Sequence, residues 1–176
     1  MIDTPAHLGG HQNMTWIDET VLDYLIARYD VRSMLDVGCG PGGMVDAAHK
    51  KGLPAAGIDG DTHIEHPFIY HHDYVTGGFP SQIEGFDLIW CVEFVEHVER
   101  QYQDNYLATF AAGRVLFLTA AYPGQGGHHH VNEQPQQYWI DLLTSRGWTL
   151  DTEATAWVRQ NGATPFAQMT GMVFTK

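Results

Sequence analysis

The stretch LDVGCGPGG, residues 35–43, decides the fold that the sequence predicts. It closes an apolar strand expected at 33–37 and opens a helix expected from 42 to 51. Glycines allow the chain to turn sharply and let its backbone approach a ligand closely, while the first turn of a helix offers free amide groups. Three of these glycines also satisfy the dinucleotide-binding fingerprint, which alone is a weak signal. The stretch therefore predicts a cofactor held at a strand-to-helix turn.

Strands and helices alternate on both sides of this turn. Further strands are expected at 53–58, 68–72, 86–91 and 115–120, and further helices at 14–29, 98–112 and 135–147. The short gap after the second strand leaves no room for a full crossover helix. At the end of the chain, 148–158 and 166–174 flank a turn at 160–162 and predict a β-hairpin. The expected fold is α/β and Rossmann-like: a mostly parallel seven-stranded sheet with helices on both faces and a C-terminal antiparallel hairpin.

Length, charge and cysteine content favour one domain in a reducing compartment. The 176 residues give room for a single core, and we expect a lid and helix at 1–30 and the cofactor-binding and catalytic core at 31–176. The formal net charge of −12 disfavours nucleic acids and membranes, since both are anionic. Neither a disulfide pattern, a signal peptide nor a membrane span is evident, so we expect a cytoplasmic protein.

Two acidic residues distinguish this turn from that of a dehydrogenase. Asp36 lies two residues before the first glycine, where dinucleotide-binding folds usually carry an apolar residue, and it can face a cationic amino-acid group. Asp59 ends the next strand, where a carboxylate can accept both hydroxyls of a ribose. A dehydrogenase would usually also need a separate substrate domain. The acids therefore favour a nucleoside cofactor that carries a positive charge.

With these residues the chain resembles the class I S-adenosylmethionine-dependent methyltransferases, of the type 11/23-like group. The resemblance runs from the strand at 33–37 to the final hairpin. It implies that S-adenosylmethionine is the cofactor, that Asp59 binds its ribose and that Asp73 lies near its adenine. The residues expected at the cofactor are Asp36, Gly38, Cys39, Gly40, Asp59, Gly60, Asp73, Tyr74 and Glu93.

A second group of polar residues follows the fourth and fifth strands. If the backbone is helical after the fourth strand, Glu93, Glu96 and His97 share one face. The loop after the fifth strand contributes His130, and His128 would point the same way if that loop is extended. Carboxylates and imidazoles are ligands for divalent ions. We therefore expect Glu93, Glu96, His97 and His130 as candidate ligands for magnesium or manganese.

This arrangement resembles that of two methyltransferase groups. The ubiquinone-biosynthesis O-methyltransferases share the Glu-x-x-Glu-His spacing of residues 93–97 and use it for magnesium. The small-RNA 3′-terminal 2′-O-methyltransferases add a histidine after the fifth strand, which His130 matches, although Asn132 and Gln134 replace aromatic residues there. A metal-free catalytic role and a structural role stay open for the same residues. His97 and His130 are the leading candidates for catalysis.

The expected reaction is methylation of an oxygen on a small hydroxylated metabolite or a sugar. Histidine accepts a proton near neutral pH, which suits a hydroxyl acceptor. Methylation of an RNA 3′ end and a non-catalytic cofactor-binding module are the alternatives. Residues 9–12 are a candidate lid over the cofactor. The residues expected on the substrate side are His11, Trp16, Tyr122 and His128, and the sequence leaves the oligomeric state open.

Overall fold

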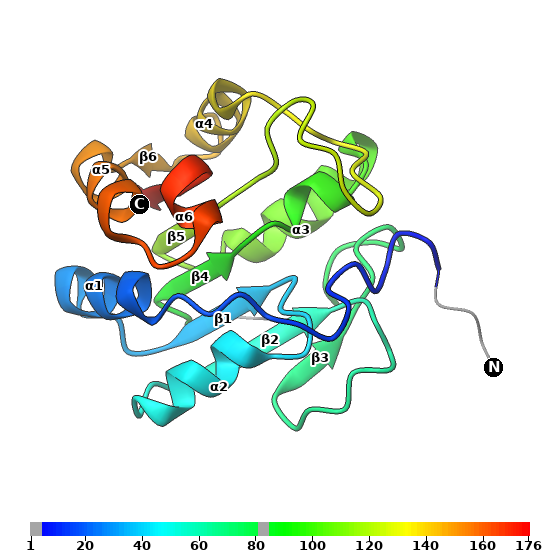
Figure 1. The fold of residues 1–176 in the computed structure, drawn as a ribbon, viewed down its shortest axis with the longest axis horizontal. Coiled ribbons are helices and arrows are strands. Elements are labelled where there is room, and N and C mark those ends of the chain that lie inside the picture. Colours follow the sequence, from blue (N-terminus) through cyan, green and yellow to red (C-terminus); the bar gives the residue numbers. More distant parts are fainter. Residues whose placement is uncertain (1–4, 81–84) are drawn as a thin grey trace.

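A seven-stranded sheet forms the centre of the molecule (Figure 1). The computed structural model describes residues 5–80 and 85–176. Its strands, in chain order, are β1 (Met34–Val37), β2 (Ala55–Asp59), β3 (Ile69–His71), β4 (Leu88–Cys91), β5 (Val115–Leu118), β6 (Thr149–Leu150) and β7 (Met172–Thr175). The order across the sheet is β3-β2-β1-β4-β5-β7-β6. The first five strands are parallel and β7 pairs antiparallel with β5 and β6, so the predicted fold class is confirmed.

Helices cover both faces of this sheet. They are α1 (Glu19–Tyr29), α2 (Gly43–Lys50), α3 (Gln103–Phe110), α4 (Gln136–Thr144), α5 (Thr152–Asn161), α6 (Pro165–Thr170) and the 3₁₀ turns η1 (Val95–His97) and η2 (Arg100–Tyr102). One core packs α3 and α4 on the sheet, and the other packs α1, α2 and α5. Successive residues of β4 alternate between these two cores, as the period of a strand requires. Both faces are therefore apolar and only the strand ends remain for chemistry.

The predicted final hairpin is wrong in its connection, although its antiparallel pairing is confirmed. Residues 152–161, of which 152–158 were expected in a strand, form α5 because Asp151 accepts a hydrogen bond from Ala154 N at 2.8 Å and caps the helix. Ala154 and Val158, four residues apart, are buried on its inner face. Thr164 caps α6 in the same way, with a proline at the first helical position. The segment expected to turn at 160–162 ends α5 instead.

Two other boundaries move for local reasons. The first helix begins at Glu19 rather than near 14, because Asp18 caps it through a 3.0 Å hydrogen bond from Val21 N. The residues before it run as an irregular segment across the strand ends. The helix expected at 98–112 is shorter and follows η2. The short gap between β2 and β3 predicted at most a short or degenerate helix, and the structure has no helix there.

No helix in the described ranges is both long enough and apolar enough to cross a bilayer. The division of the chain at residue 30 into lid and core stays a prediction, and residues 1–4 of that lid lie outside the described residues.

Candidate active site

The glycine-rich turn is fixed to the end of the neighbouring strand. Gly38 N and Cys39 N both donate to Ile58 O, at 2.9 and 3.2 Å. Gly40 N donates to Asp59 Oδ2 at 2.8 Å. Gly38 has a φ of +77°, and a side chain there would collide with the ring of Phe94. Glycine is therefore required at this position both for the turn and for the approach of the next loop.

Asp36 places a buried acidic group in the floor of the site. Its side chain is buried at the end of β1, and no hydrogen bond between described residues reaches its carboxylate. Burial, and secondarily the charge of Asp59, hold the pKa of Asp36 well above its usual value. A buried carboxylate without a partner favours a cationic ligand group beside it.

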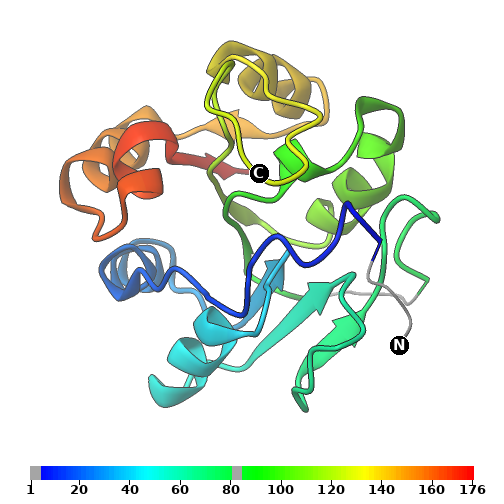
Figure 2. The same ribbon diagram turned by 45° about the vertical axis from the view of Figure 1, so that its right-hand side comes forward.

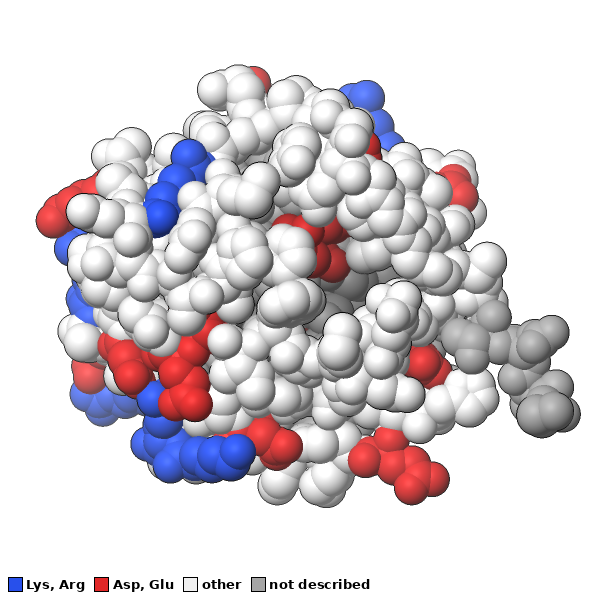
Figure 3. All heavy atoms as spheres, in the orientation of Figure 1, with Lys and Arg blue, Asp and Glu red and all other residues white. Residues whose placement is uncertain are grey.

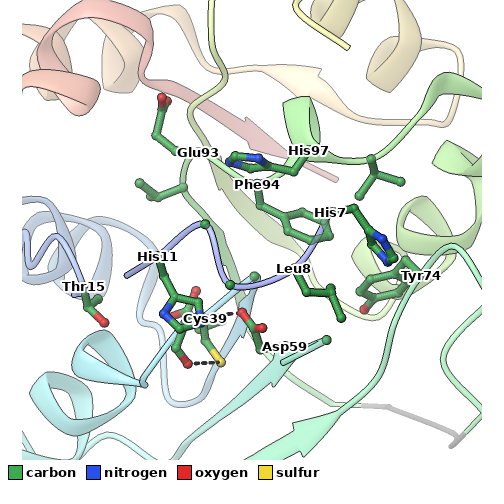
Figure 4. Close-up of a pocket in the computed structure, with 18 of the residues that line it drawn as sticks. His7, Leu8, His11, Thr15, Cys39, Asp59, Tyr74, Glu93, Phe94 and His97 are labelled. Atoms are coloured by element: carbon green, nitrogen blue, oxygen red, sulfur yellow. Dashed lines mark hydrogen bonds between the residues drawn. The ribbon is translucent and has the colours of Figure 1, made fainter. Parts of the chain in front are cut away.

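A cavity of about 360 Å³ opens above this floor. Its walls are the ends of β1, β2 and β4, the segment after β3 and residues 7–16, which cross the strand ends (Figures 2 and 4). Leu8 lies against Gly60 and His11 lies against Gly40. The N-terminal segment therefore covers the glycine-rich turn, and its role as a lid stays a prediction.

Side chains after β3 close the far end of this cavity. His7 Nε2 lies 2.8 Å from Asp73 Oδ2, so the N-terminal segment is held to this end of the site. The Tyr74 hydroxyl is buried and donates to Thr109 Oγ1 at 2.9 Å. Burial raises the pKa of Tyr74, so its ring is a neutral wall of the cavity.

Three of the four candidate metal ligands converge. One ligand atom each from Glu96, His97 and His130 lies within 4.8 Å of the others. Glu96 is fully buried: its Oε1 accepts from Ala121 N at 3.2 Å, while its Oε2 has no hydrogen-bond partner among the described residues. The rings of His97 and His130 are 4.9 Å apart and nearly perpendicular. We call these three residues the Glu-His cluster.

The electrostatics of the Glu-His cluster follow from its burial. Burial, and then the nearby Glu93 carboxylate, hold the pKa of Glu96 well above its usual value. Burial, reinforced by His130, lowers the pKa of His97 to about 4. The imidazole of His97 is therefore neutral at physiological pH and has a lone pair available for a proton or a cation.

Glu93 does not join the cluster, which corrects the expected four-ligand arrangement. Its φ of +50° interrupts the helical path that would have placed it beside Glu96. Its carboxylate instead accepts from Thr119 Oγ1 at 2.8 Å and from Gln125 Nε2 at 3.0 Å. Figure 4 shows Glu93 and His97 pointing in different directions from the end of β4. Glu93 still lines the main cavity.

Comparison with known proteins supports the cofactor expected at this site. The family described as "Methyltransferase domain" matches residues 11–157 of the chain. The chain belongs to this family. Its cofactor is S-adenosylmethionine, and the expectation of an S-adenosylmethionine-dependent enzyme is confirmed.

Individual relatives of this methyltransferase are distant. The ubiquinone biosynthesis O-methyltransferase of Leptothrix cholodnii is 28% identical over 110 residues, which are 53% of this chain and 43% of that protein. The match thus spans less than half of the relative's length.

Solved structures share the fold at low identity. The methyltransferase domain of bacterial CtHen1 has a TM-score of 0.61 at 15% identity and covers 90% of this chain and 96% of that one. Magnesium protoporphyrin IX methyltransferase of Synechocystis PCC 6803, solved with bound SAM, has a TM-score of 0.59 at 16% identity and covers 94% and 78%.

The substrate-side residues of the methyltransferase separate into two places. His11 and Trp16 line the main cavity. His11 Nε2 lies 3.2 Å from Asp61 Oδ2, outside hydrogen-bond geometry, and Trp16 packs edge-on against Phe166. Tyr122 lines a second, smaller cavity instead.

The loop after β5 is not extended, which corrects the expected alternation of its histidines. His129 has a φ of +49° and lies in a turn. His128 is exposed, with its ring against Gly10, while His130 turns inward and its Nδ1 lies 3.0 Å from Glu133 Oε1. Only His130 of this loop joins the Glu-His cluster.

Sequence patterns missed the residues that join the walls of the methyltransferase site. Leu8 and Phe94 pack on glycines of other segments, and Thr119 holds Glu93. Apolar residues in loops and a threonine at a strand end carry no spacing signal, so only the tertiary structure identifies them. Gly38 was an indirect indication of the Phe94 contact, because a glycine at a tight turn leaves space for a neighbouring side chain.

The main cavity is acidic. Among the described residues that line it, Asp36, Asp59, Asp73 and Glu93 are carboxylates and none is Lys or Arg. Figure 3 shows acidic atoms within the hollow on this face, while Lys and Arg gather toward the edges. This lining suits a cationic cofactor and is unfavourable for phosphates.

Proposed function

We propose that this methyltransferase transfers the methyl group of S-adenosylmethionine to a hydroxyl of a small molecule. The observation that carries the proposal is the Glu-His cluster, Glu96, His97 and His130, whose His97 also lines the cofactor cavity. A neutral hydroxyl attacks poorly and must lose its proton, whereas an amine often needs no strong base. A neutral buried imidazole beside carboxylates suits that requirement.

The reaction is an in-line displacement. The acceptor oxygen forms a bond to the methyl carbon as the bond from carbon to sulfur breaks, so that S-adenosylhomocysteine leaves. The hydroxyl proton goes to a base, for which His97 and His130 are the candidates. The site must hold the acceptor oxygen at about 3 Å from the methyl carbon, opposite the sulfur. Orientation of the two reactants therefore contributes together with proton removal.

The acidic residues of the main cavity are proposed to hold the cofactor. Asp36 faces its cationic amino-acid portion, because that buried carboxylate has no other partner among the described residues. Asp59 binds the ribose hydroxyls, and its present hydrogen bonds from Gly40 N and Asp61 N fix the orientation of the carboxylate. Asp73 and Tyr74 border the adenine. Gly38, Cys39, Gly40 and Gly60 supply the close backbone surface.

The Glu-His cluster fits a divalent cation. Glu96 Oε2 is buried without a hydrogen-bond partner among the described residues, and one ligand atom each from Glu96, His97 and His130 lies within 4.8 Å of the others. A mixed carboxylate and imidazole set favours manganese or another transition ion over magnesium in affinity. Such an ion would supply Lewis-acid assistance to the loss of the acceptor's proton. Glu96, His97 and His130 would hold it, without Glu93.

Metal binding is tested with the purified chain saturated with S-adenosylhomocysteine. Manganese should raise the unfolding temperature of the wild type, since a ligand that binds only the folded state stabilises it. Glu96→Gln should remove this shift, and Glu99→Gln, on an exposed glutamate nearby, should keep it. Metal analysis of the two variants should differ in the same way. Equal manganese responses in all three proteins would assign the cluster a metal-free role.

The alternative acceptor is the 3′ end of an RNA. The likeness to the CtHen1 domain concerns the fold, and the carboxylate lining and the net charge of −12 oppose a phosphate chain. A screen of pooled metabolites and short RNAs with methyl-labelled cofactor separates the two. Label on the oxygen of a small molecule supports the proposal, and label on RNA or on nitrogen contradicts it.

Two free, buried cysteines fit our proposal of a cytoplasmic location.

A further inference from the structure

The loop that carries His130 has no helix or strand of its own. It runs over residues 119–135, from the end of β5 to α4 (Figure 1). Its glycines, which widen the range of backbone conformations, are Gly124, Gly126 and Gly127. The place of His130 therefore depends on the contacts that the loop makes. On one side, Val131 N and Asn132 N both donate to Glu96 O, at 3.0 and 3.1 Å, which fixes this part of the loop beside the Glu-His cluster.

Glu133 gathers the other side of this loop. Its Oε2 accepts from Gly124 N at 2.7 Å, and its Oε1 accepts from Gly126 N at 2.6 Å. The same Oε1 lies 3.0 Å from His130 Nδ1, and the side chains of Glu133 and His130 are 17% and 10% exposed. An ionised carboxylate only accepts hydrogen bonds, so Nδ1 is the donor and carries the ring proton. One glutamate thus fixes both the loop backbone and the proton of His130.

The second ring nitrogen of His130 is left without a partner. A neutral imidazole with its proton on Nδ1 has its free lone pair on Nε2. No hydrogen bond among the described residues reaches Nε2, and a side chain at Gly127 would collide with this atom. Glycine at that position therefore leaves space at Nε2. A general base and a metal ligand both need such a lone pair.

We propose that Glu133 is a positioning residue for His130: its carboxylate keeps the proton on Nδ1 and so leaves the Nε2 lone pair to the Glu-His cluster. Glu133 lines neither of the two cavities described above, so it acts through the imidazole. Carboxylates that pair with a histidine in this way fix its tautomer and its ring orientation. The inference rests on the proposed role of the Glu-His cluster, and it holds whether His130 serves as a base or as a metal ligand.

The tautomer of His130 is the direct test. The full-length chain, labelled with nitrogen-15 and saturated with S-adenosylhomocysteine, is measured at pH 8 with a chelator, so that imidazoles are mostly neutral and no cation selects a tautomer. A long-range proton–nitrogen spectrum shows which ring nitrogen carries the proton, and His130→Gln identifies the His130 signals by their loss. The wild type should carry the proton on Nδ1. Glu133→Ala should move most of it to Nε2.

Two further variants separate positioning of the imidazole from folding of the loop. Glu133→Gln is the conservative variant: its side-chain carbonyl can still accept from Nδ1, so it should retain most of the Nδ1 proton. Glu99→Ala removes an exposed glutamate just after η1 and should keep the wild-type tautomer. All three variants should bind S-adenosylhomocysteine with nearly the wild-type affinity, because neither glutamate lines the main cavity. This affinity reports that the fold is intact.

Manganese affinity is the second measurement, made without chelator as the rise in unfolding temperature on titration with the ion. Glu133→Ala should weaken manganese binding by about 10- to 100-fold, the usual loss when a carboxylate behind a ligating histidine is removed. Glu133→Gln should lose less, and Glu99→Ala should match the wild type.

The outcomes distinguish this role of Glu133 from the role of the cluster. A wild-type proton on Nε2, a tautomer that survives Glu133→Ala, or equal changes in Glu133→Ala and Glu133→Gln would assign Glu133 to loop folding alone and overturn the proposal, with the Glu-His cluster still standing. Equal manganese affinities in the wild type and Glu133→Ala would also overturn it. A wild type that does not respond to manganese contradicts the metal instead, and the tautomer change then supports Glu133 as the positioning residue of a base.

Discussion

The site at the carboxyl ends of the strands has two halves, which are built in different ways. We call the ends of β1 and β2 the cofactor half, and the segments after β4 and β5 the acceptor half. In the cofactor half, backbone amides of one short turn donate to groups at the end of the next strand, Ile58 O and the Asp59 carboxylate. In the acceptor half, Glu93 and Glu96 hold loops that are distant in sequence, through Thr119, Gln125 and Ala121. The difference teaches that one half of the site is positioned by a local turn and the other by contacts between distant segments.

His97 should distinguish the two halves most strongly. His97→Ala should lower turnover by at least about 100-fold, the low end for removal of a general base. The affinity for S-adenosylhomocysteine should stay nearly unchanged, because the Asp36 and Asp59 carboxylates are untouched. Single-turnover kinetics and calorimetry on the same preparation measure both effects. A parallel loss of affinity would show that the two halves act as one unit.

Gly38 tests the point where the two halves touch. Gly38→Ala places a methyl group against Phe94 with a φ of +77°, and should reduce the free energy of unfolding by about 2–4 kcal/mol from left-handed strain and overpacking. Gly52 has a similar φ of +76° and no atom within 4 Å of an added Cβ. Gly52→Ala should therefore cost only about 1–2 kcal/mol. Equal losses of unfolding free energy for the two variants in denaturant titrations would mean that the Phe94 ring moves aside without a measurable cost.

Asp59 tests the cofactor half alone. Asp59→Ala should weaken the binding of S-adenosylhomocysteine by about 1–3 kcal/mol, the cost of unmet polar partners. Turnover at saturating cofactor should stay close to that of the wild type, because the Glu-His cluster is unchanged. Calorimetry and initial rates measure the two quantities. Unchanged affinity, or a large fall in saturated turnover, would contradict the separation of the halves.

The N-terminal segment should give the smallest effect. His7 lies 2.8 Å from Asp73, and both side chains are partly exposed. Such a pair contributes about 0.2–1 kcal/mol, so His7→Ala should weaken the binding of S-adenosylhomocysteine by less than Asp59→Ala does. Calorimetry in low salt measures this difference. A loss larger than that of Asp59→Ala would make this segment a principal part of the cofactor site.

The sequence predicted the cofactor half better than the acceptor half for a physical reason. Asp36, the glycines and Asp59 lie within 24 residues of one another, and their places follow from strand and turn geometry. The direction of Glu93 depends on a φ of +50°, which an Asp, Asn or Gly would have signalled and a Glu does not. The inward turn of His130 depends equally on the left-handed His129. Such conformations are fixed by tertiary contacts.

The C-terminal part of the sheet shows the same limit of prediction from sequence. Five parallel strands and the antiparallel pairing of the last two were predicted, because apolar runs and turn residues mark strands locally. The strands at 148–158 and 166–174 were overextended because their apolar residues also fit a helical period. Asp151 and Thr164 are capping residues, yet a cap is recognised only once a helix is expected after it. The prediction therefore mistook two short helices for the continuation of strands.

The place of β7 has a consequence for how this protein is made. Residues 172–175 lie inside the sheet, between β5 and β6. Until the ribosome has released them, β5 presents an open edge of four apolar residues, all of which are buried in the finished fold. Unpaired apolar edges are templates for association with other chains. A nascent chain that pauses before this strand therefore carries an unpaired apolar edge that a chaperone would protect from association.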